Sequence, residues 1–348
     1  MEHQKDSLGI LDLMIRPGFC VKENKIVRCN RAAQGLLLSE GDDILPLLLT
    51  GKAEYEAFRS GCLYLSLRLN GQDFGASVTR MDEGDVFILD QESDQGELQA
   101  MALAARELRE PLANVMISAD KLLRSVDGPD AARLNQGLYQ MLRIIGNMSD
   151  AVKYTASSRQ EIRDISALVA SIFEKAGALV EQADIHLEYT GCEEAIYCLV
   201  DEEQLERAVL NILSNAIRFL PKGGTIQAEF VRCGRSMRLS VLDSGSGIAQ
   251  EILTNVFRQY LRQPGLEEGR HGIGLGMVLI RSTAANHGGT VLIDQPEKGG
   301  TRITVTFAIR QDTDTLLRSP ILRVDYAGER DHALLELSES LPSKLYKQ

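Results

Sequence analysis

The sequence lacks any apolar run long enough to cross a membrane. Its longest apolar stretches, ILPLLL at 44–49 and GLLL at 35–38, are far shorter than the roughly 18 residues that a membrane helix requires. The first residues, MEHQKDSLGI, are polar and do not have the layout of a secretion signal. We therefore expect no membrane span and a cytoplasmic location.

Cysteine pairs and an excess of positive charge are also missing. The six cysteines form no C-x-x-C pair and no cluster with histidine at zinc-ligand spacing, so we expect reduced thiols and no zinc site. The 38 lysines and arginines are outnumbered by 49 aspartates and glutamates, which gives a net charge of −11. This balance argues against a nucleic-acid partner, because binding a phosphate backbone requires a large basic face.

Two common nucleotide-binding motifs are absent as well. No G-x-x-x-x-G-K-[ST] segment occurs, which excludes a P-loop, and the glycine spacing does not fit a Rossmann fold. Histidine is missing from residues 4–185, since the sequence passes directly from His3 to His186. That gap excludes any histidine chemistry in the first half of the chain beyond residue 3.

The 348 residues are enough for two or three domains. Over residues 1–92, short strands and turns predict a small α/β unit. Glu23-Asn24 and Asn70-Gly71 are expected to turn two strand pairs, NRAAQGLLL predicts a short helix, and DVFILD predicts a last strand. This order resembles a PAS sensory domain, which would make 1–92 an input domain.

Residues 93–158 change to a helical period. Apolar residues step by three and four along two segments, and DGPD at 127–130 separates them. The two seams are Leu98, Met101, Ala105, Leu108, Leu112, Val115, Ala119 and Leu122, followed by Leu134, Leu138, Met141, Ile145, Met148 and Val152. An antiparallel hairpin of two helices has too narrow an apolar stripe to be stable alone. We therefore expect a homodimer in which two hairpins form a four-helix bundle.

Residues 159–311 predict a second α/β unit. Its segment DEEQLERAVLNILSNAIRF at 201–219 predicts a helix that begins at the capping residue Asp201. Apolar residues occupy the expected buried face, and a second face carries Arg207, Asn211, Asn215 and Arg218. Amides flanked by arginines suit a divalent ion and phosphate oxygens. The sequence of this helix alone is equally compatible with a phosphate site and with a plain polar surface.

Two glycine-rich loops favour the phosphate site. SVLDSGSGI runs from a strand into Asp243, Gly245 and Gly247. RHGIGLGMVLI places three glycines directly before a helix: Gly272, Gly274 and Gly276. Glycines let backbone N–H groups approach phosphate closely, and a helix N-terminus adds partial positive charge.

The ordered set Asn-x-x-x-Asn, Asp-x-Gly-x-Gly, Phe257 and Gly-x-Gly-x-Gly, followed by NHGGTVLI and KGGTRITVTF, resembles the GHKL ATP-binding domain. Within that superfamily it is similar to the sensor histidine kinases of two-component signalling. The resemblance implies an α+β multidomain protein with an α/β-sandwich ATPase domain (HATPase_c) at 159–311. It also implies ATP and Mg²⁺ as cofactors.

The same resemblance implies roles for single residues. Asp243 would accept a hydrogen bond from the adenine amino group, Asn215 would ligate Mg²⁺, and Asn211 and Arg218 would lie near the phosphates. Arg262 would contact the terminal phosphate, and 261–270 would form a short lid. His271 and His287 are expected to be packing groups.

The resemblance extends to the first long helix, where ARELREPL at 105–112 follows the family frame S-H-E-L-R-T-P-L. Arg106 takes the place of the phosphate-accepting histidine, Glu107 that of the assisting acid, and Glu110 that of the Thr or Asn that positions water in phosphatases. A guanidinium is protonated at physiological pH and is a very poor nucleophile. An exposed Arg106–Glu110 ion pair is the simplest expectation for this surface.

We therefore predict Mg-ATP binding without autophosphorylation, in a pseudokinase-like regulator of a response regulator or partner kinase. One alternative is an anti-sigma-factor-like protein-serine kinase or ATP-gated binding switch, against which the long helices and the N-terminal unit count. Another is a slow ATPase. Asn211 argues against it, since hydrolysing GHKL members carry a glutamate base there and an amide cannot take a proton. The tail, 312–348, is expected to hold a strand at SPILRVDY and a short amphipathic helix at RDHALLELSESL.

Overall fold

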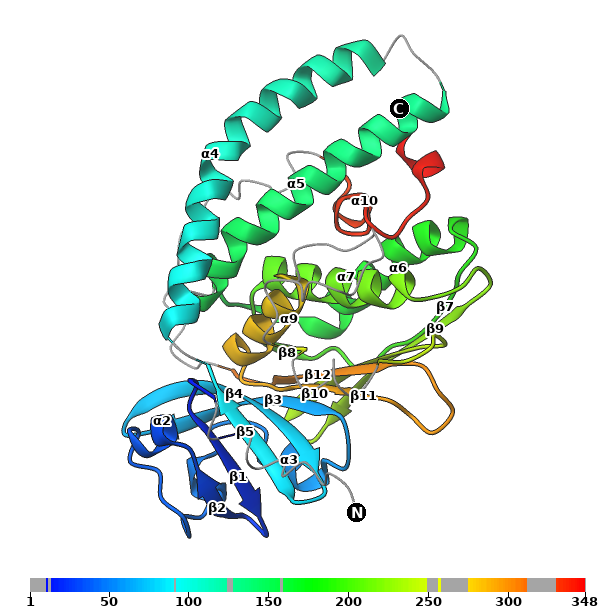
Figure 1. Ribbon diagram of the computed structural model, residues 1–348. Coiled ribbons are helices and arrows are strands. Elements are labelled where there is room, and N and C mark those ends of the chain that lie inside the picture. The colour runs from blue at the N-terminus through cyan, green and yellow to red at the C-terminus, as the bar shows by residue number, and fades with distance from the viewer. Residues whose placement is uncertain are drawn as a thin grey trace, which may run out of the picture.

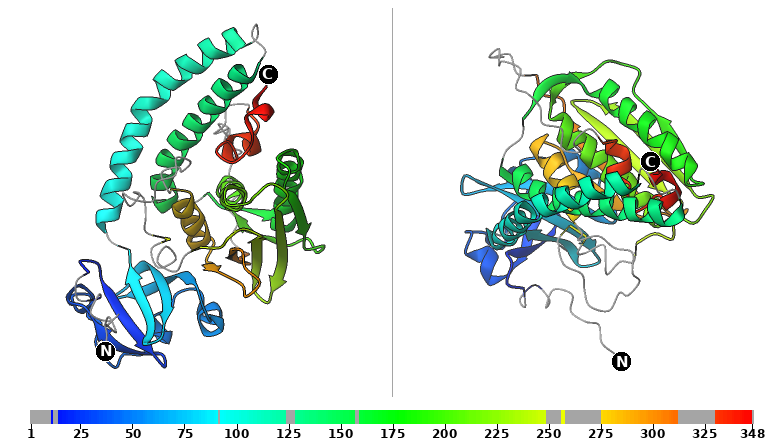
Figure 2. Two further views of the ribbon diagram at one scale, coloured as in Figure 1. Left: turned by 45° about the vertical axis from the view of Figure 1, so that its right-hand side comes forward. Right: turned by 90° about the horizontal axis from the view of Figure 1, so that it is seen from above.

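The computed structural model describes residues 11, 14–90, 92–123, 128–156, 159–248, 256–257, 275–311 and 330–347. Figure 1 shows an N-terminal sheet unit, two long helices that rise beside each other, and an α/β unit under them. The C-terminal segment lies between the long helices and the α/β unit in both side views (Figures 1 and 2).

The N-terminal unit is built on five antiparallel strands in the order β2-β1-β5-β4-β3. They are β1 Gly18–Lys22, β2 Lys25–Cys29, β3 Cys62–Leu69, β4 Gln72–Met81 and β5 Gly84–Leu89, with α2 Arg31–Gln34, η1 Leu45–Leu47 and α3 Lys52–Ala57 between β2 and β3. Both predicted turns are confirmed, since Glu23, Asn24, Asn70 and Gly71 all have positive φ. Such paired positive angles form the tight turns that match the twist of a hairpin.

The two long helices are α4 Glu92–Leu123 and α5 Pro129–Ala156. They run antiparallel and pack along most of their length (Figure 1). Only part of the predicted seam of α4 is buried, namely Leu98, Ala105, Leu112 and Ala119. Met116 and Leu123 are buried as well, although they lie outside that seam. Leu108, Val115 and Leu122 are exposed in the single chain.

The α/β unit has helices on one face of a mixed sheet. Its elements are β6 Glu161–Asp164, α6 Ile165–Gln182, β7 His186–Thr190, β8 Tyr197–Val200, α7 Glu202–Arg218, β9 Thr225–Cys233, β10 Ser236–Asp243, α9 Leu275–Asn286, β11 Val291–Asp294 and β12 Arg302–Ala308. The sheet order is β11-β12-β10-β9-β7, in which β7 and β9 are parallel, and β6 pairs with β8 separately.

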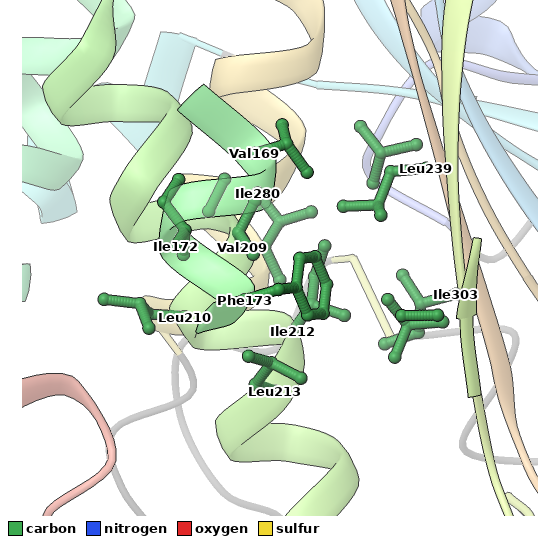
Figure 3. Close-up of a cluster of buried hydrophobic side chains, with 14 of the residues drawn as sticks. Val169, Ile172, Phe173, Val209, Leu210, Ile212, Leu213, Leu239, Ile280 and Ile303 are labelled. Atoms are coloured by element: carbon green, nitrogen blue, oxygen red, sulfur yellow. The ribbon is translucent and has the colours of Figure 1, made fainter. Parts of the chain in front are cut away.

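The main core lies between these helices and the sheet. Figure 3 shows Phe173, Val209 and Ile212 directed toward Leu239 and Ile303 of the strands. Each fully buried side chain of this size stabilises the fold by about 1.5–3 kcal/mol relative to exposure. This core holds α7 against the sheet and leaves the opposite, polar face of α7 directed toward α5.

The N-terminal and α/β units share one ten-stranded sheet, because β3 pairs antiparallel with β11. Gly61 precedes β3 with φ of 93°, and a Cβ there would lie 2.1 Å from the carbonyl oxygen of Ile293, so only glycine fits this close approach. Beside this joint, Arg281 of α9 pairs with Asp90 at 2.9 Å and lies over the ring of Tyr64. The N-terminal unit is thus connected to the helix that follows the second glycine loop.

The cysteines are free thiols, as predicted. Burial raises the pKa values of Cys20, Cys29 and Cys198 to about 11, which keeps these thiols protonated and unreactive at neutral pH. None of the helices in the described ranges is long and apolar enough to span a membrane.

The C-terminal segment, residues 330–347, contains α10 His332–Glu336 and η2 Ser343–Tyr346. The predicted short helix is confirmed, and Asp331 caps it by accepting the N–H of Leu334 at 2.8 Å. Ala333, Leu337, Leu341 and Tyr346 join the main core. The predicted strand at SPILRVDY lies outside the described residues.

Candidate nucleotide site

Helix α7 begins as the sequence predicts and presents two different faces. The carboxylate of Asp201 accepts the N–H of Gln204 at 3.2 Å, and the apolar face is buried. The four predicted polar residues do share a second face. Arg207 and Asn211 are each only 1% exposed, whereas Asn215 and Arg218 are partly exposed. Interior positions for an arginine and an amide require polar partners, because an unpaired buried polar group is unfavourable.

Helix α5 supplies part of those partners. Its residues Gln136, Gln140, Arg143, Asn147 and Asp150 are spaced by four and three, which makes a polar stripe beside the apolar seam. Arg143 donates from Nη2 to Oδ1 of Asn211 at 3.0 Å, and Arg207 donates to Oδ1 of Asn147 and pairs with Asp150. Sequence reasoning missed this contribution, although the polar stripe within a buried helix was a readable signal.

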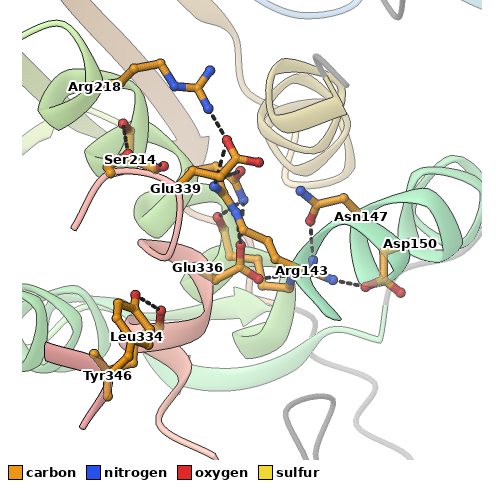
Figure 4. Close-up of polar contacts among 12 residues, drawn as sticks. Arg143, Asn147, Asp150, Ser214, Arg218, Leu334, Glu336, Glu339 and Tyr346 are labelled. Atoms are coloured by element: carbon orange, nitrogen blue, oxygen red, sulfur yellow. Dashed lines mark hydrogen bonds and ion pairs between the residues drawn. The ribbon is translucent and has the colours of Figure 1, made fainter. Parts of the chain in front are cut away.

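The C-terminal segment supplies the remaining partners (Figure 4). Glu336, which is fully buried, accepts from Nε of Arg207 at 2.9 Å and from Nε of Arg143 at 3.3 Å. Glu339 pairs with Arg218 and lies 3.3 Å from Nη1 of Arg143. Nothing in the local sequence of either glutamate indicates a partner more than 120 residues away.

The first turn of α9 closes the site from a third side. A Cβ on Gly276 would lie 2.8 Å from Oδ1 of Asn211, so a larger residue would displace that buried amide. Asn215 donates from Nδ2 to the sulfur of Met277 at 3.5 Å. A cavity of about 60 Å³ remains between the helices. It is lined by Arg143, Ile144, Asn147, Asn211, Asn215, Arg218, Leu275, Gly276, Met277 and Glu339.

Asp243 lies at the end of β10, 6% exposed. Its Oδ1 accepts the backbone N–H groups of Gly245 at 2.8 Å and of Thr301 at 3.2 Å. Burial raises the pKa of Asp243 above its usual value, and the hydrogen bonds from Gly245 and Thr301 partly oppose that rise. A carboxylate has about four lone-pair sites, so Asp243 can accept from an amino group of a ligand in addition to these bonds. Gly247, with φ of 81°, continues the turn.

His287 has a packing role, as predicted. Its Nε2 accepts the N–H of Asp201 at 3.0 Å, which makes Nδ1 the donor to the carbonyl of Thr283 at 2.7 Å. Burial lowers the pKa of His287, so the ring is neutral and fixes the start of α7. His271 lies outside the described residues, as do Arg262, Gly272, Gly274 and the predicted lid at 261–270.

Arg106, Glu107 and Glu110 lie on the exposed surface of α4 and take no part in the cavity. The predicted Arg106–Glu110 ion pair is wrong: both residues are described, and no ion pair joins them. Exposed pairs of this kind contribute only a few tenths of a kcal/mol, too little to order two long side chains in water.

Among the described residues, two side chains have the chemistry needed at the two ends of Mg-ATP. A buried carboxylate at Asp243 can accept from an adenine amino group, and the amide oxygen of Asn215 can ligate Mg²⁺ at the cavity. The cavity beside Asn215 is too small for a triphosphate. The cavity of about 60 Å³ has room for a few water molecules, whereas small-molecule sites measure roughly 300–1,000 Å³.

Comparison with known proteins finds relatives of the α/β unit. A family model described as "Histidine kinase-, DNA gyrase B-, and HSP90-like ATPase" matches residues 200–311. The sensor-like histidine kinase SenX3 of Mycolicibacterium smegmatis is 26% identical over 244 residues, which cover 66% of this chain and 62% of that protein. The histidine protein kinase DivJ of Caulobacter vibrioides is 27% identical over 236 residues, or 62% of this chain and 40% of DivJ.

The sensor protein KdpD of Clostridium acetobutylicum is 24% identical over 207 residues, or 56% of this chain and 23% of KdpD. The chain therefore spans less than two thirds of the length of each of these three relatives. Among solved structures, the catalytic domain of histidine kinase ThkA aligns with a TM-score of 0.39 at 18% identity, over 44% of this chain and 97% of that one. Full-length ShkA in complex with AMPPNP aligns with a TM-score of 0.49 at 20% identity, over 62% and 47%.

Proposed function

We propose, from the premise that this chain belongs to the sensor histidine kinase family of GHKL ATPases, that it binds Mg-ATP as a signalling protein without phosphorylating its own hairpin. In this proposal it is a pseudokinase-like regulator within two-component signalling. A response regulator or a partner kinase is the partner that family membership implies.

The ATP-binding half of the proposal is supported by the two ends of the site. The carboxylate of Asp243 would accept a hydrogen bond from the adenine amino group, while its Oδ1 also accepts the backbone N–H groups of Gly245 and Thr301. Asn215 would hold Mg²⁺, whose charge would offset that of the phosphates. Asn211 and Arg218 would orient the phosphates, while Arg262, Gly272 and Gly274 stay predicted contributors.

The missing acceptor carries the second half of the proposal. Arg106 stands in the family's histidine position on the exposed surface of α4, and neither long helix contains a histidine. A protonated guanidinium has no free lone pair with which to attack the terminal phosphorus. Glu107, the vestigial base, therefore has no acceptor to assist. What remains to this chain is nucleotide binding that changes its conformation.

Labelled ATP tests this prediction. The purified chain with Mg²⁺ and ATP labelled in the terminal phosphate is expected to bind nucleotide but to retain no acid-labile, base-stable label. An Arg106→His variant is the matched control and is expected to gain such label, because Glu107 already stands beside the restored imidazole.

Acid-labile label on residues 93–158 of the unchanged chain would contradict the proposal. Acid-stable label on a partner protein would favour the alternative of a protein-serine kinase. If the Arg106→His variant also retained no label, the missing histidine would not be the only obstacle to phosphorylation. The geometry of the hairpin would then prevent phosphate transfer as well.

We also propose that the chain forms a homodimer through α4 and α5. Each long helix carries exposed apolar residues seven positions apart. On α4 they are Leu108, Val115 and Leu122, and on α5 they are Leu134 and Met141. Each of these side chains is 45–65% exposed. Apolar stripes with this period pair with another helix in bundles. This arrangement supports a four-helix bundle with a second copy.

A Val115→Asp substitution is expected to convert a dimer into a monomer of 38.4 kDa, because an aspartate would be buried at the interface. Sedimentation at micromolar concentration measures this change. Val27→Asp, at an exposed valine of the N-terminal sheet, is the matched control and should stay dimeric. A parent chain that sediments as a monomer at tens of micromolar would refute the dimer.

The remaining predictions about organisation are part of the same proposal. A PAS-like input domain at 1–92 is supported by the strand order β2-β1-β5-β4-β3 with short helices between β2 and β3. The further divisions at 93–158, 159–311 and 312–348 follow the changes between helical and α/β elements. The cytoplasmic location stays a prediction from the sequence.

A further inference from the structure

The C-terminal segment 330–347 lies against the polar face of α7, where the proposed function places the phosphates of a nucleotide. It lies between α5 and α7, directly over the polar face of α7 (Figures 1 and 4). Ser340 donates to the carbonyl of Ser214 at 3.0 Å on one side, and Gln136 donates to the carbonyl of Leu341 at 2.7 Å on the other. The segment is therefore bound to both helices at once.

Apolar and aromatic contacts anchor the segment away from the site. Leu337 is fully buried, and Tyr346 is 2% exposed with its ring edge-on to Tyr139 at 5.3 Å. The hydroxyl of Tyr346 donates to the carbonyl of Leu334 at 2.7 Å, and Asn135 of α5 donates to the carbonyl of Tyr346 at 2.8 Å. Burial on this scale indicates a specific docked conformation of the segment.

The segment directs two carboxylates at the polar face of α7, which carries the proposed phosphate contacts Asn211 and Arg218. Glu336 accepts from Arg207 and Arg143 and lies 3.4 Å from Nδ2 of Asn211. Glu339 pairs with Arg218 and lines the cavity beside Asn215. A carboxylate that satisfies arginine and amide donors uses the same hydrogen bonds that a phosphate oxygen would use.

We propose that residues 330–347 are an intrachain inhibitor in which Glu336 and Glu339 compete with the phosphates of Mg-ATP for the polar face of α7. This inference rests on the proposed nucleotide site. In this proposal bound ATP and the docked segment exclude each other, because Glu336 and Glu339 already hold the donors of Arg207, Arg143 and Arg218. Because the segment also ties α5 to α7, its release by ATP frees the hairpin to move relative to the ATP-binding unit.

Calorimetric titration with AMPPNP and Mg²⁺ tests the proposal. Glu339→Gln removes the competing charge, and Tyr346→Ala weakens the docking without touching the nucleotide residues. Both variants are expected to bind the analogue more tightly than the parent, by between about 5-fold and 150-fold, the usual range for coupled sites. Glu181→Gln, at an exposed glutamate of α6, makes the same charge change and should bind like the parent.

The outcomes separate this inference from the nucleotide site itself. Tighter binding by Glu339→Gln alone would mean a local charge effect and would overturn the inhibitor. Equal, measurable affinity in parent and variants would also overturn it, while leaving the nucleotide site in place. An absence of binding in every chain would remove the proposed function and the inference together.

Hydrogen exchange in the unchanged chain provides a second test that needs no variant. Since coupling between two sites is reciprocal, saturating AMPPNP and Mg²⁺ should accelerate exchange of the amides over 334–341. Unchanged protection of these amides at saturation would overturn the inhibitor even if the variants failed to fold.

Discussion

Replacing Arg207 by methionine is expected to lower the free energy of unfolding by about 3–5 kcal/mol. The guanidinium is 1% exposed and contacts Glu336, Asp150 and Asn147. Without it, the negative charges of Asp150 and Glu336 both lose an arginine that neutralises them. Removing one partner of a buried ion pair leaves an uncompensated charge in a medium that solvates it poorly, which is why the expected loss is large.

Denaturant unfolding followed by circular dichroism measures the effect as a lower midpoint at unchanged slope. Arg163→Met is the matched control, since Arg163 pairs with Glu202 at 3.1 Å but is 41% exposed. Its expected loss is at most about 1 kcal/mol, because exposed pairs are screened by water and salt. Equal, small losses in both variants would mean that the packing of α5, α7 and the C-terminal segment does not persist in solution.

An Asp243→Asn substitution is expected to weaken nucleotide binding by about 5-fold to 150-fold. An amide nitrogen turned toward the adenine amino group would place two donors face to face, and an unmatched polar contact in a closed site opposes binding by about 1–3 kcal/mol. A thermal-shift titration with AMPPNP and Mg²⁺ measures the loss. Asp73→Asn, at an exposed aspartate of the N-terminal sheet, should leave affinity unchanged. Parent-like affinity in Asp243→Asn would remove the adenine contact from the proposal.

The same variant has an expected pH signature in the absence of nucleotide. Burial raises the pKa of Asp243 above its usual 3.8, so the folded chain holds that proton more tightly than the unfolded chain. Stability from this group is therefore present at acidic pH and is lost as pH rises above about 3.8 through the raised folded value. The free energy of unfolding of Asp243→Asn should equal that of the parent at low pH and should exceed it as pH rises.

Local signals account for the elements and for the proposal that the hairpin is not phosphorylated. Asp201 begins α7 and Asn30 begins α2, because a side-chain oxygen before a helix satisfies free N–H groups whatever the rest of the chain does. Asn70-Gly71 turns its strand pair for a similarly local reason. The proposal that Arg106 accepts no phosphate rests on side-chain chemistry alone, because the sequence shows an arginine at that position.

Only the tertiary structure decided which polar faces are buried and which segments of the chain cover them. Asn211 was predicted to lie near phosphate, yet in the fold it and Arg207, on the same helix face, meet Glu336, which lies more than 120 residues further along the chain. The joint of β3 with β11 was likewise absent from any local pattern. The physical reason is that a polar helix face or a strand edge is equally stable in water or against a matching partner. Whether such a face is buried or exposed therefore depends on which distant part of the chain the fold packs against it.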